Sequence, residues 1–153
     1  MNKIIKSTKS MGQSLWLDSI SREMINSGEI ENLINAGITG ITSNPTIFDK
    51  AIGESNVYDS ALIEYSKTSK TTEEIFEKLA IDDIKKAANL LRKTYQSSNF
   101  NDGYVSIEVS PQHANNSEAT IVEADRLWNK INEPNVMIKV PGTNEGFVAV
   151  KTL

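Results

Sequence analysis

The pattern of apolar and polar positions alternates along the chain between short strand-like segments and longer helical ones. Continuous apolar bursts bounded by turn residues predict four strands, at residues 14–19, 38–45, 103–110 and 135–142. Helical spacing of apolar residues occupies residues 21–37, with an interruption at Gly28, most of residues 46–96, and residues 117–131. A further helix is expected to begin after Gly142.

Strands that alternate with helices through short turns predict right-handed crossovers and a parallel sheet. No Pro-rich or Gly/Ser-rich linker divides the chain, and no repeat is visible beyond the strand–helix alternation. The expected fold class is therefore α/β, and residues 1–153 are expected to form one domain or part of one. Two helix starts carry capping residues: Thr71 or Thr72 before the long helix, and Ser117 before the helix of residues 117–131.

Polar residues on the predicted strands can be sorted by face, because side chains on a strand alternate. Each strand has one wholly apolar face and one face that carries polar groups toward its carboxyl end. The carboxyl ends of parallel strands meet at one rim, so the side chains there are expected to converge. This is the layout of a TIM-type (β/α)8 barrel interior, where reactive groups gather at the C-terminal mouth. The converging residues are Asp18, Asn44, Glu108 and Lys139.

Lys139 stands out because it interrupts an apolar strand, between Ile138 and Val140. Burial disfavours an ammonium ion, and a neutral amine is the form that attacks a carbonyl to give a Schiff base. The resulting iminium is an electron sink that allows a C–C bond next to a hydroxyl to break. That step needs a base, and imine formation and hydrolysis need an activated water. Asp18 and Glu108 are the available carboxylates.

A purely structural interpretation remains open for each of these residues. Lys139 and Glu108 could form an ion pair that only satisfies its own charges. Asp18 could cap the following helix, and Asn44, before Pro45, could be an ordinary turn residue. The common position of all four at the same ends of four strands favours a functional site.

Composition excludes several kinds of partner. The formal net charge is −4, and the 16 basic residues form no block, so neither nucleic acid nor an anionic membrane is an expected partner. The chain has no cysteine, which excludes disulfides, thiolate nucleophiles and cysteine-ligated metals and fits a reducing compartment. No apolar run has the length of a signal peptide or a membrane span. A soluble, cytoplasmic protein is expected.

Several longer strings that contain these residues resemble the transaldolase family, the sugar-phosphate class I aldolases of the pentose phosphate pathway. The resemblance runs from about Ser14 to Leu153. It implies a (β/α)8 barrel that transfers a dihydroxyacetone unit from a ketose phosphate to an aldose phosphate, with no metal or organic cofactor. The strings are LWLDSISREMINSGEIENLI, GITGITSNPTIFDKAIGESNVYD, DGYVSIEVSP, EADRLW and NVMIKVPGTNEG.

The same resemblance implies a role for each residue of the polar rim. Lys139 is the Schiff-base lysine, and Asp18 acts as acid and base at the cleaved hydroxyl. Glu108 positions the catalytic water. Asn44 holds the hydroxyls of the bound three-carbon unit.

The sequence departs from the family pattern in two respects. His113, the single histidine, stands where the family more often has an apolar residue. It could be a surface loop residue or a pH-sensitive contact, and we expect the former because no partner cluster accompanies it. The chain also supplies only four strand–helix units, the first half of a barrel that normally takes about 250 residues. The family's phosphate-binding serine and arginines, and a threonine that works with the glutamate, come from later strands. Arg22 lies too close to Asp18 in the sequence to be assigned a phosphate role.

Three functional hypotheses follow. Residues 1–153 could be the N-terminal part of a transaldolase that needs the other half for phosphate affinity and barrel closure. They could instead be a catalytically silent half-barrel that self-associates through its open edges. The third hypothesis is a small fructose-6-phosphate aldolase. Transaldolase is favoured over it by the long insertion between Ile47 and Phe100 and by the string SNPTIF.

Overall fold

The computed structural model describes residues 3–153 and contains one parallel sheet. The strands follow one another in sequential order, as the alternating pattern predicted. They are β1 (Trp16–Leu17), β2 (Gly40–Ile41), β3 (Tyr104–Glu108) and β4 (Val136–Lys139). The fold is thus α/β, with four parallel strand–helix units that correspond to half of a TIM barrel.

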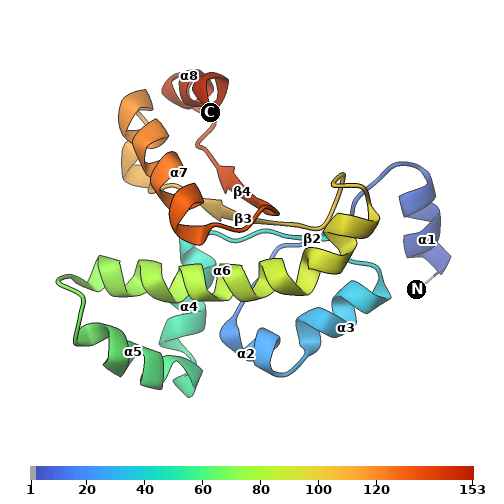
Figure 1. Ribbon diagram of the computed structural model, residues 1–153, viewed down its shortest axis with the longest axis horizontal. Helices are drawn as coiled ribbons and strands as arrows, with labels where there is room; N and C mark the ends of the chain where they lie inside the picture. The colour runs from blue at the N-terminus through green and yellow to red at the C-terminus, as the bar shows by residue number, and fades with distance from the viewer. Residues whose placement is uncertain (1–2) are drawn as a thin grey trace.

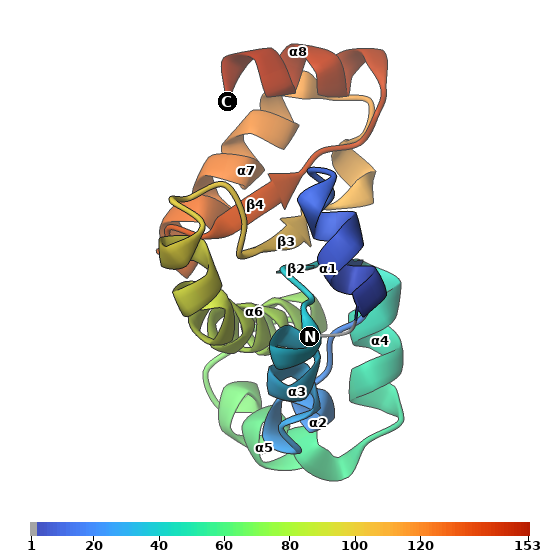
Figure 2. The same ribbon diagram turned by 90° about the vertical axis from the view of Figure 1, so that its right-hand side faces the viewer.

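Most helices lie along one side of this sheet (Figures 1 and 2), the long helix of residues 72–97 crosses beneath the strands in Figure 1, and the helix of residues 3–10 stands apart from them. The α-helices are α1 (Lys3–Ser10), α2 (Arg22–Asn26), α3 (Glu29–Ala36), α4 (Pro45–Gly53), α5 (Asp59–Ser66), α6 (Thr72–Ser97), α7 (Ser117–Ile131) and α8 (Asn144–Thr152). Two short 3-10 helices, η1 (Asn56–Tyr58) and η2 (Pro111–His113), connect them. The sequence pattern did not predict α1, which buries none of its residues.

The first two strands are shorter than predicted, because side chains at their carboxyl ends start helices almost at once. Ser21 accepts a hydrogen bond from the backbone N–H of Met24 and caps α2. Asn44 accepts one from the N–H of Ile47 and caps α4. The helices thus begin within a few residues of the strands, and β1 pairs with β2, and β2 with β3, over two residues each.

Other helix boundaries agree with the sequence, with one correction. The break at Gly28, which has a positive φ of 77°, separates α2 from α3, and Thr71 caps α6. The residue that caps α7 is Asn116 and not Ser117, because the Asn116 side chain accepts the N–H of Ala119 while Ser117 is already helical.

The hydrophobic core lies between the sheet and the helices. The outward-facing side chains of β3, Val105 and Ile107, are buried, as is Ile41 of β2. They pack in one cluster with α6 and α7, including Leu91 and Leu127. One face of β2 and of β3 therefore packs against the helices, as the alternation of apolar residues predicted.

A buried polar network ties α2, η1 and α6 together. Arg22 donates from Nε to the Asp83 carboxylate at 2.9 Å, and Asp83 has no solvent exposure. The Tyr58 hydroxyl donates to the other carboxylate oxygen and accepts the backbone N–H of Arg22, both at 2.8 Å. The Arg22 guanidinium also stacks 4.6 Å from the centre of the Tyr58 ring. Burial raises the pKa of Tyr58 and of Asp83.

A second ionic cluster joins α6 to α7. Arg126 donates to both oxygens of the Glu77 carboxylate, at 2.8 and 2.6 Å, and Lys130 donates at 2.7 Å. The Arg126 hydrogen bond in particular lowers the pKa of Glu77 to about 2, well below its ordinary 4.5.

This cluster gives a pH-dependent prediction. Glu77→Gln should lower the free energy of unfolding at pH 7 by about 1 kcal/mol, since solvent screens the partly exposed pairs. Because the pKa of Glu77 is lower in the folded state than in the unfolded state, its carboxylate stabilises the fold at pH values above the unfolded pKa. This stabilisation is lost as the pH falls from about 4.5 to about 2. Urea unfolding at pH 7 and pH 3 should show the difference from the native protein shrinking in acid. Glu64→Gln, at an exposed site on α5, is the control, and an unchanged difference at both pH values would contradict the assignment.

Candidate active site

The polar rim lies on the face of the sheet opposite the core. Glu108 and Lys139 are register partners on β3 and β4, so their side chains emerge next to each other. The Lys139 ammonium forms an ion pair with the Glu108 carboxylate, and the two side chains are 38% and 30% exposed. Their strand neighbour Ile107 is buried in the core. The placement of both residues therefore agrees with the parity of the strands.

Lys139 also reaches across the sheet. Its Nζ donates to the backbone carbonyl of Ser43 at 3.1 Å, and the Ser43 hydroxyl donates to the carbonyl of Ser106 at 2.7 Å. The lysine therefore connects β4, β3 and the end of β2. The sequence led us to expect a partly desolvated amine, and the Lys139 side chain is 38% exposed with the Glu108 carboxylate beside its ammonium.

Asp18 lies beyond the end of β1, and the Thr42 hydroxyl donates to its carboxylate. The interpretation of Asp18 as a helix cap is wrong, since Ser21 caps the helix that follows. The carboxylate is exposed on the same rim. Thr42 orients this group, a role that the sequence analysis did not assign.

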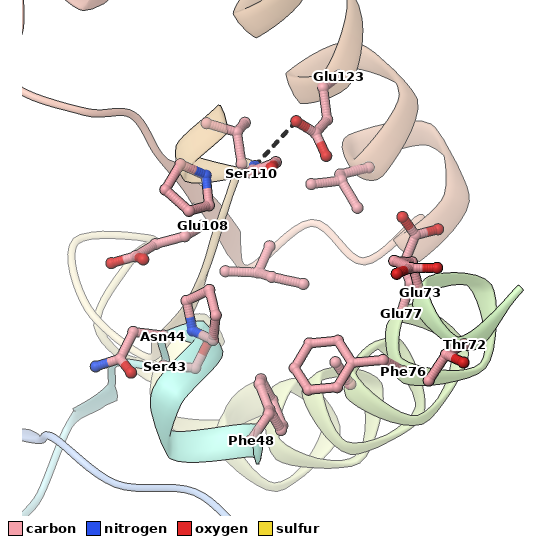
Figure 3. A pocket seen from close by; sticks show the side chains of 16 residues that line it. Ser43, Asn44, Phe48, Thr72, Glu73, Phe76, Glu77, Glu108, Ser110 and Glu123 are labelled. Carbon is pink, nitrogen blue, oxygen red and sulfur yellow. Dashed lines mark hydrogen bonds between the residues drawn. The ribbon is translucent and has the colours of Figure 1, made fainter. Parts of the chain in front are cut away.

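The Asn44 side chain has one group that holds a helix and another that is available on the rim. Its oxygen caps α4 at 2.9 Å from the N–H of Ile47, whereas the sequence analysis considered only a turn residue as its structural role. Its amide nitrogen has no hydrogen bond among the residues that the structure describes. Figure 3 shows the ends of the Asn44 and Glu108 side chains directed to the same side, away from the helix-lined pocket. The amide can thus serve as a donor on the rim while its oxygen holds the helix.

Three polar residues next to the rim escaped the sequence analysis as functional candidates: Thr42, Ser43 and Ser106. Parity placed Thr42 and Ser106 on the polar face, but hydroxyl residues are too common in strands for that signal to single them out. Ser106 is 3% exposed, and its hydroxyl has no partner among residues 3–153. Ser43 acts through its backbone carbonyl, which no side-chain pattern reveals.

His113 differs from its expected role as an unpartnered loop residue. Its Nε2 lies 3.3 Å from a carboxylate oxygen of Glu123, and the same oxygen accepts the backbone N–H of Ser110 at 2.9 Å. Glu123 of α7 therefore holds the turn that follows β3, two residues beyond Glu108.

None of the three arginines of the chain faces the polar rim with a free guanidinium. Arg22 is buried against Asp83, Arg92 pairs with Glu133, and Arg126 pairs with Glu77. Any phosphate bound at this rim must be held by groups other than these. Within residues 3–153 there is also no group of three or more His, Cys, Asp or Glu side chains that could hold a metal ion. The helices of this part of the chain are too short or too polar to cross a membrane.

Fold and rim together define a protein of the (β/α)-barrel class in which a lysine and two carboxylates lie at the carboxyl ends of the strands. The family described as transaldolase/fructose-6-phosphate aldolase matches residues 15–153. This chain belongs to that family. The resemblance inferred from the strings around Asp18, Asn44, Glu108 and Lys139 is confirmed at this level.

The curated relatives are similar over nearly all of this chain but are much longer. Transaldolase 2 of Nostoc sp. is 49% identical over 144 residues, which are 94% of this chain and 38% of the relative. Transaldolase of Thiobacillus denitrificans is 42% identical over 151 residues, 98% of this chain and 42% of the relative. Transaldolase of Neisseria meningitidis is 35% identical over 150 residues, which are 98% of this chain and 43% of the relative. The chain therefore spans about two fifths of the length of these relatives.

Proposed function

We propose that residues 1–153 are the N-terminal part of a transaldolase barrel domain and carry its covalent chemistry. The reaction transfers a dihydroxyacetone unit between sugar phosphates, from sedoheptulose 7-phosphate to glyceraldehyde 3-phosphate, and yields erythrose 4-phosphate and fructose 6-phosphate. The observation that supports this most is the Lys139–Glu108 pair on the open concave face of a member of this family. The protein acts in the cytoplasm, with no cofactor, and its phosphate-binding groups lie on later strands.

The first step is attack of the Lys139 amine on the ketose carbonyl. The ammonium gives up a proton before it attacks, and the paired Glu108 carboxylate is placed to accept it. The new N–C bond forms, one proton passes from the nitrogen to the carbonyl oxygen, a second returns to that oxygen from Glu108, and the oxygen leaves as water to give the iminium. In the reverse direction Glu108 positions the water that hydrolyses the imine.

The second step breaks the C–C bond beside the substrate hydroxyl. Asp18 takes the hydroxyl proton, the aldose leaves as an aldehyde, and the bonding electrons pass into the iminium to give an enamine on Lys139. The Thr42 hydroxyl holds the Asp18 carboxylate in place. The Asn44 amide donates to the hydroxyls of the retained three-carbon unit. Attack of the enamine on a second aldehyde reverses these events.

These roles predict different kinetic defects for the two carboxylates in the complete protein, or in this chain combined with a complementing half. Asp18→Asn should still form the imine but slow C–C cleavage by about 100-fold or more. Glu108→Gln should instead slow both formation and hydrolysis of the imine. Single-turnover measurements separate the steps. Asp49→Asn, an exposed change on α4, should alter neither. Equal loss of every step in both variants would contradict the division of roles.

The alternative is a catalytically silent half-barrel that works only through association. It is favoured by the exposed apolar side chains at the β4 edge, including Trp128, Phe147 and Leu153. Trp128 and Leu153 line a groove of about 470 Å³ together with Ile138 and Val140, and Phe147 is exposed on α8, the helix that ends just before Leu153. The outer edges of β1 and β4 have no strand partner within residues 3–153.

Self-association through these edges is expected for the isolated chain. Sedimentation velocity across a range of protein concentrations should show a species larger than the 16.9 kDa monomer. Replacing Phe147 by lysine should shift the chain toward the monomer, whereas Val57→Lys, at an exposed site on η1, should not. A chain that stays monomeric at all concentrations would remove the support for this alternative.

A further inference from the structure

A pocket of about 370 Å³ lies on the other side of β3 from Lys139, between the sheet and three helices. Figure 3 shows it enclosed by α4, α6 and α7, with the carboxylate of Glu108 directed out of it. Its volume is within the range that small-molecule sites occupy. The lining residues that matter here are Phe48, Glu73, Phe76, Ala80, Ile107 and Leu127.

The interior of the pocket is apolar. Ile107 comes from the helix-packed face of β3, and Leu127 comes from α7. Phe48 and Phe76 meet edge to face, with ring centres 6.4 Å apart and planes at 88°. This arrangement presents ring edges and aliphatic carbons, which is a suitable environment for one more aromatic ring.

The charged groups that line the pocket are all acidic: Glu73, Glu77, Glu108 and Glu123. No lysine or arginine belongs to the lining. Glu77 is held by Arg126 and Lys130, and Glu123 by the Ser110 amide and His113. Glu73, in the first turn of α6, is exposed at the mouth of the pocket. Hydrogen bonds from its own backbone N–H and from Thr71 lower its pKa, which favours the ionised carboxylate.

We propose that this pocket binds small hydrophobic amines, with the ring between Phe48, Phe76 and Leu127 and the ammonium at Glu73. Basic side chains balance the other three lining carboxylates, so Glu73 is the group that favours an ammonium over a phosphate or another anion. The pocket shares Ser43, Asn44 and Glu108 with the concave rim, but the Glu108 carboxylate is directed away from it, so the proposal does not depend on the transaldolase function. Because β3 separates the two, binding in the pocket contacts the same strand that carries Glu108.

The probe for this site is 2-phenylethylamine, titrated into the isotope-labelled chain without any sugar phosphate. The expected dissociation constant is on the order of 1 mM, as suits a ligand of this size. Amide resonances of Phe76, Ile107 and Leu127 should move, with smaller changes at Glu108. Phenylacetate has the same ring and the opposite charge, and it should bind at least about tenfold more weakly. Equal binding of both probes, or shifts confined to other surfaces, would overturn the proposal.

Two variants test the ring and the charge separately. Ala80→Leu places additional carbon atoms in the pocket and should abolish the shifts. Glu73→Gln should weaken binding of the amine about threefold and leave phenylacetate no weaker. Glu74→Gln, the neighbouring residue of the same helix turn that does not line the pocket, is the matched control and should change the affinity less than twofold. Should Ala80→Leu not fold, the Glu73 and Glu74 comparison decides alone, and identical affinities there would refute the assignment.

Discussion

Replacing Arg22 by methionine should lower the free energy of unfolding by about 3–5 kcal/mol, the largest loss of stability expected from a single change in this chain. Arg22 is the cation that balances Asp83, a carboxylate with no solvent exposure, and removal of the guanidinium leaves that charge buried with only the Tyr58 hydroxyl as partner. Urea unfolding at neutral pH measures the change. Lys93→Met, at an exposed site on α6, should change the stability by no more than about 0.5 kcal/mol.

The double variant Arg22→Met/Asp83→Leu tests whether apolar residues can replace this buried ion pair. With both charges gone, most of the lost stability should return, because apolar residues of similar volume often replace a buried pair without cost. A single Arg22→Met variant as stable as the native chain would show that Asp83 is balanced in some other way.

The chain by itself should turn over fructose 6-phosphate and erythrose 4-phosphate far more slowly than a complete transaldolase, by more than about tenfold. Phosphate groups bind best to arginine forks and backbone donors, and all three arginines here are engaged with carboxylates away from the rim. A coupled steady-state assay measures the rate. Addition of a polypeptide that supplies the later strands should raise it. Turnover within tenfold of a complete enzyme would show that the missing phosphate contacts matter little.

The strand faces could be predicted from the sequence because a two-residue period is unambiguous in β3 and β4. Lys139 and Glu108 had to lie on one face and Ile107 on the other, and their pairing follows from the register of adjacent parallel strands. The same logic placed Asp18 and Asn44 on the rim. What it could not reveal was the second use of Asn44 as a cap, because one side chain can serve a helix and a site together.

Contacts between distant segments were the part that the sequence could not predict. Arg22 and Asp83 are 61 positions apart, and nothing local distinguishes Arg22 from an arginine near the rim. The partner of His113 lies one helix further along, at Glu123, and the pocket behind β3 is assembled from α4, α6 and α7.

The amine of Lys139 should form a covalent imine with the ketose. Borohydride reduction in the presence of fructose 6-phosphate, with the complete protein or the complemented chain, should leave a dihydroxyacetone-derived adduct on the peptide that contains NVMIKVPG. Lys139→Arg keeps the charge but cannot supply a neutral amine, so it should abolish the adduct. If Lys139 and Glu108 form only a structural ion pair, no adduct appears and Lys139→Met is tolerated. An adduct mapped to another lysine, such as Lys50 or Lys151, would contradict the account even in an active aldolase.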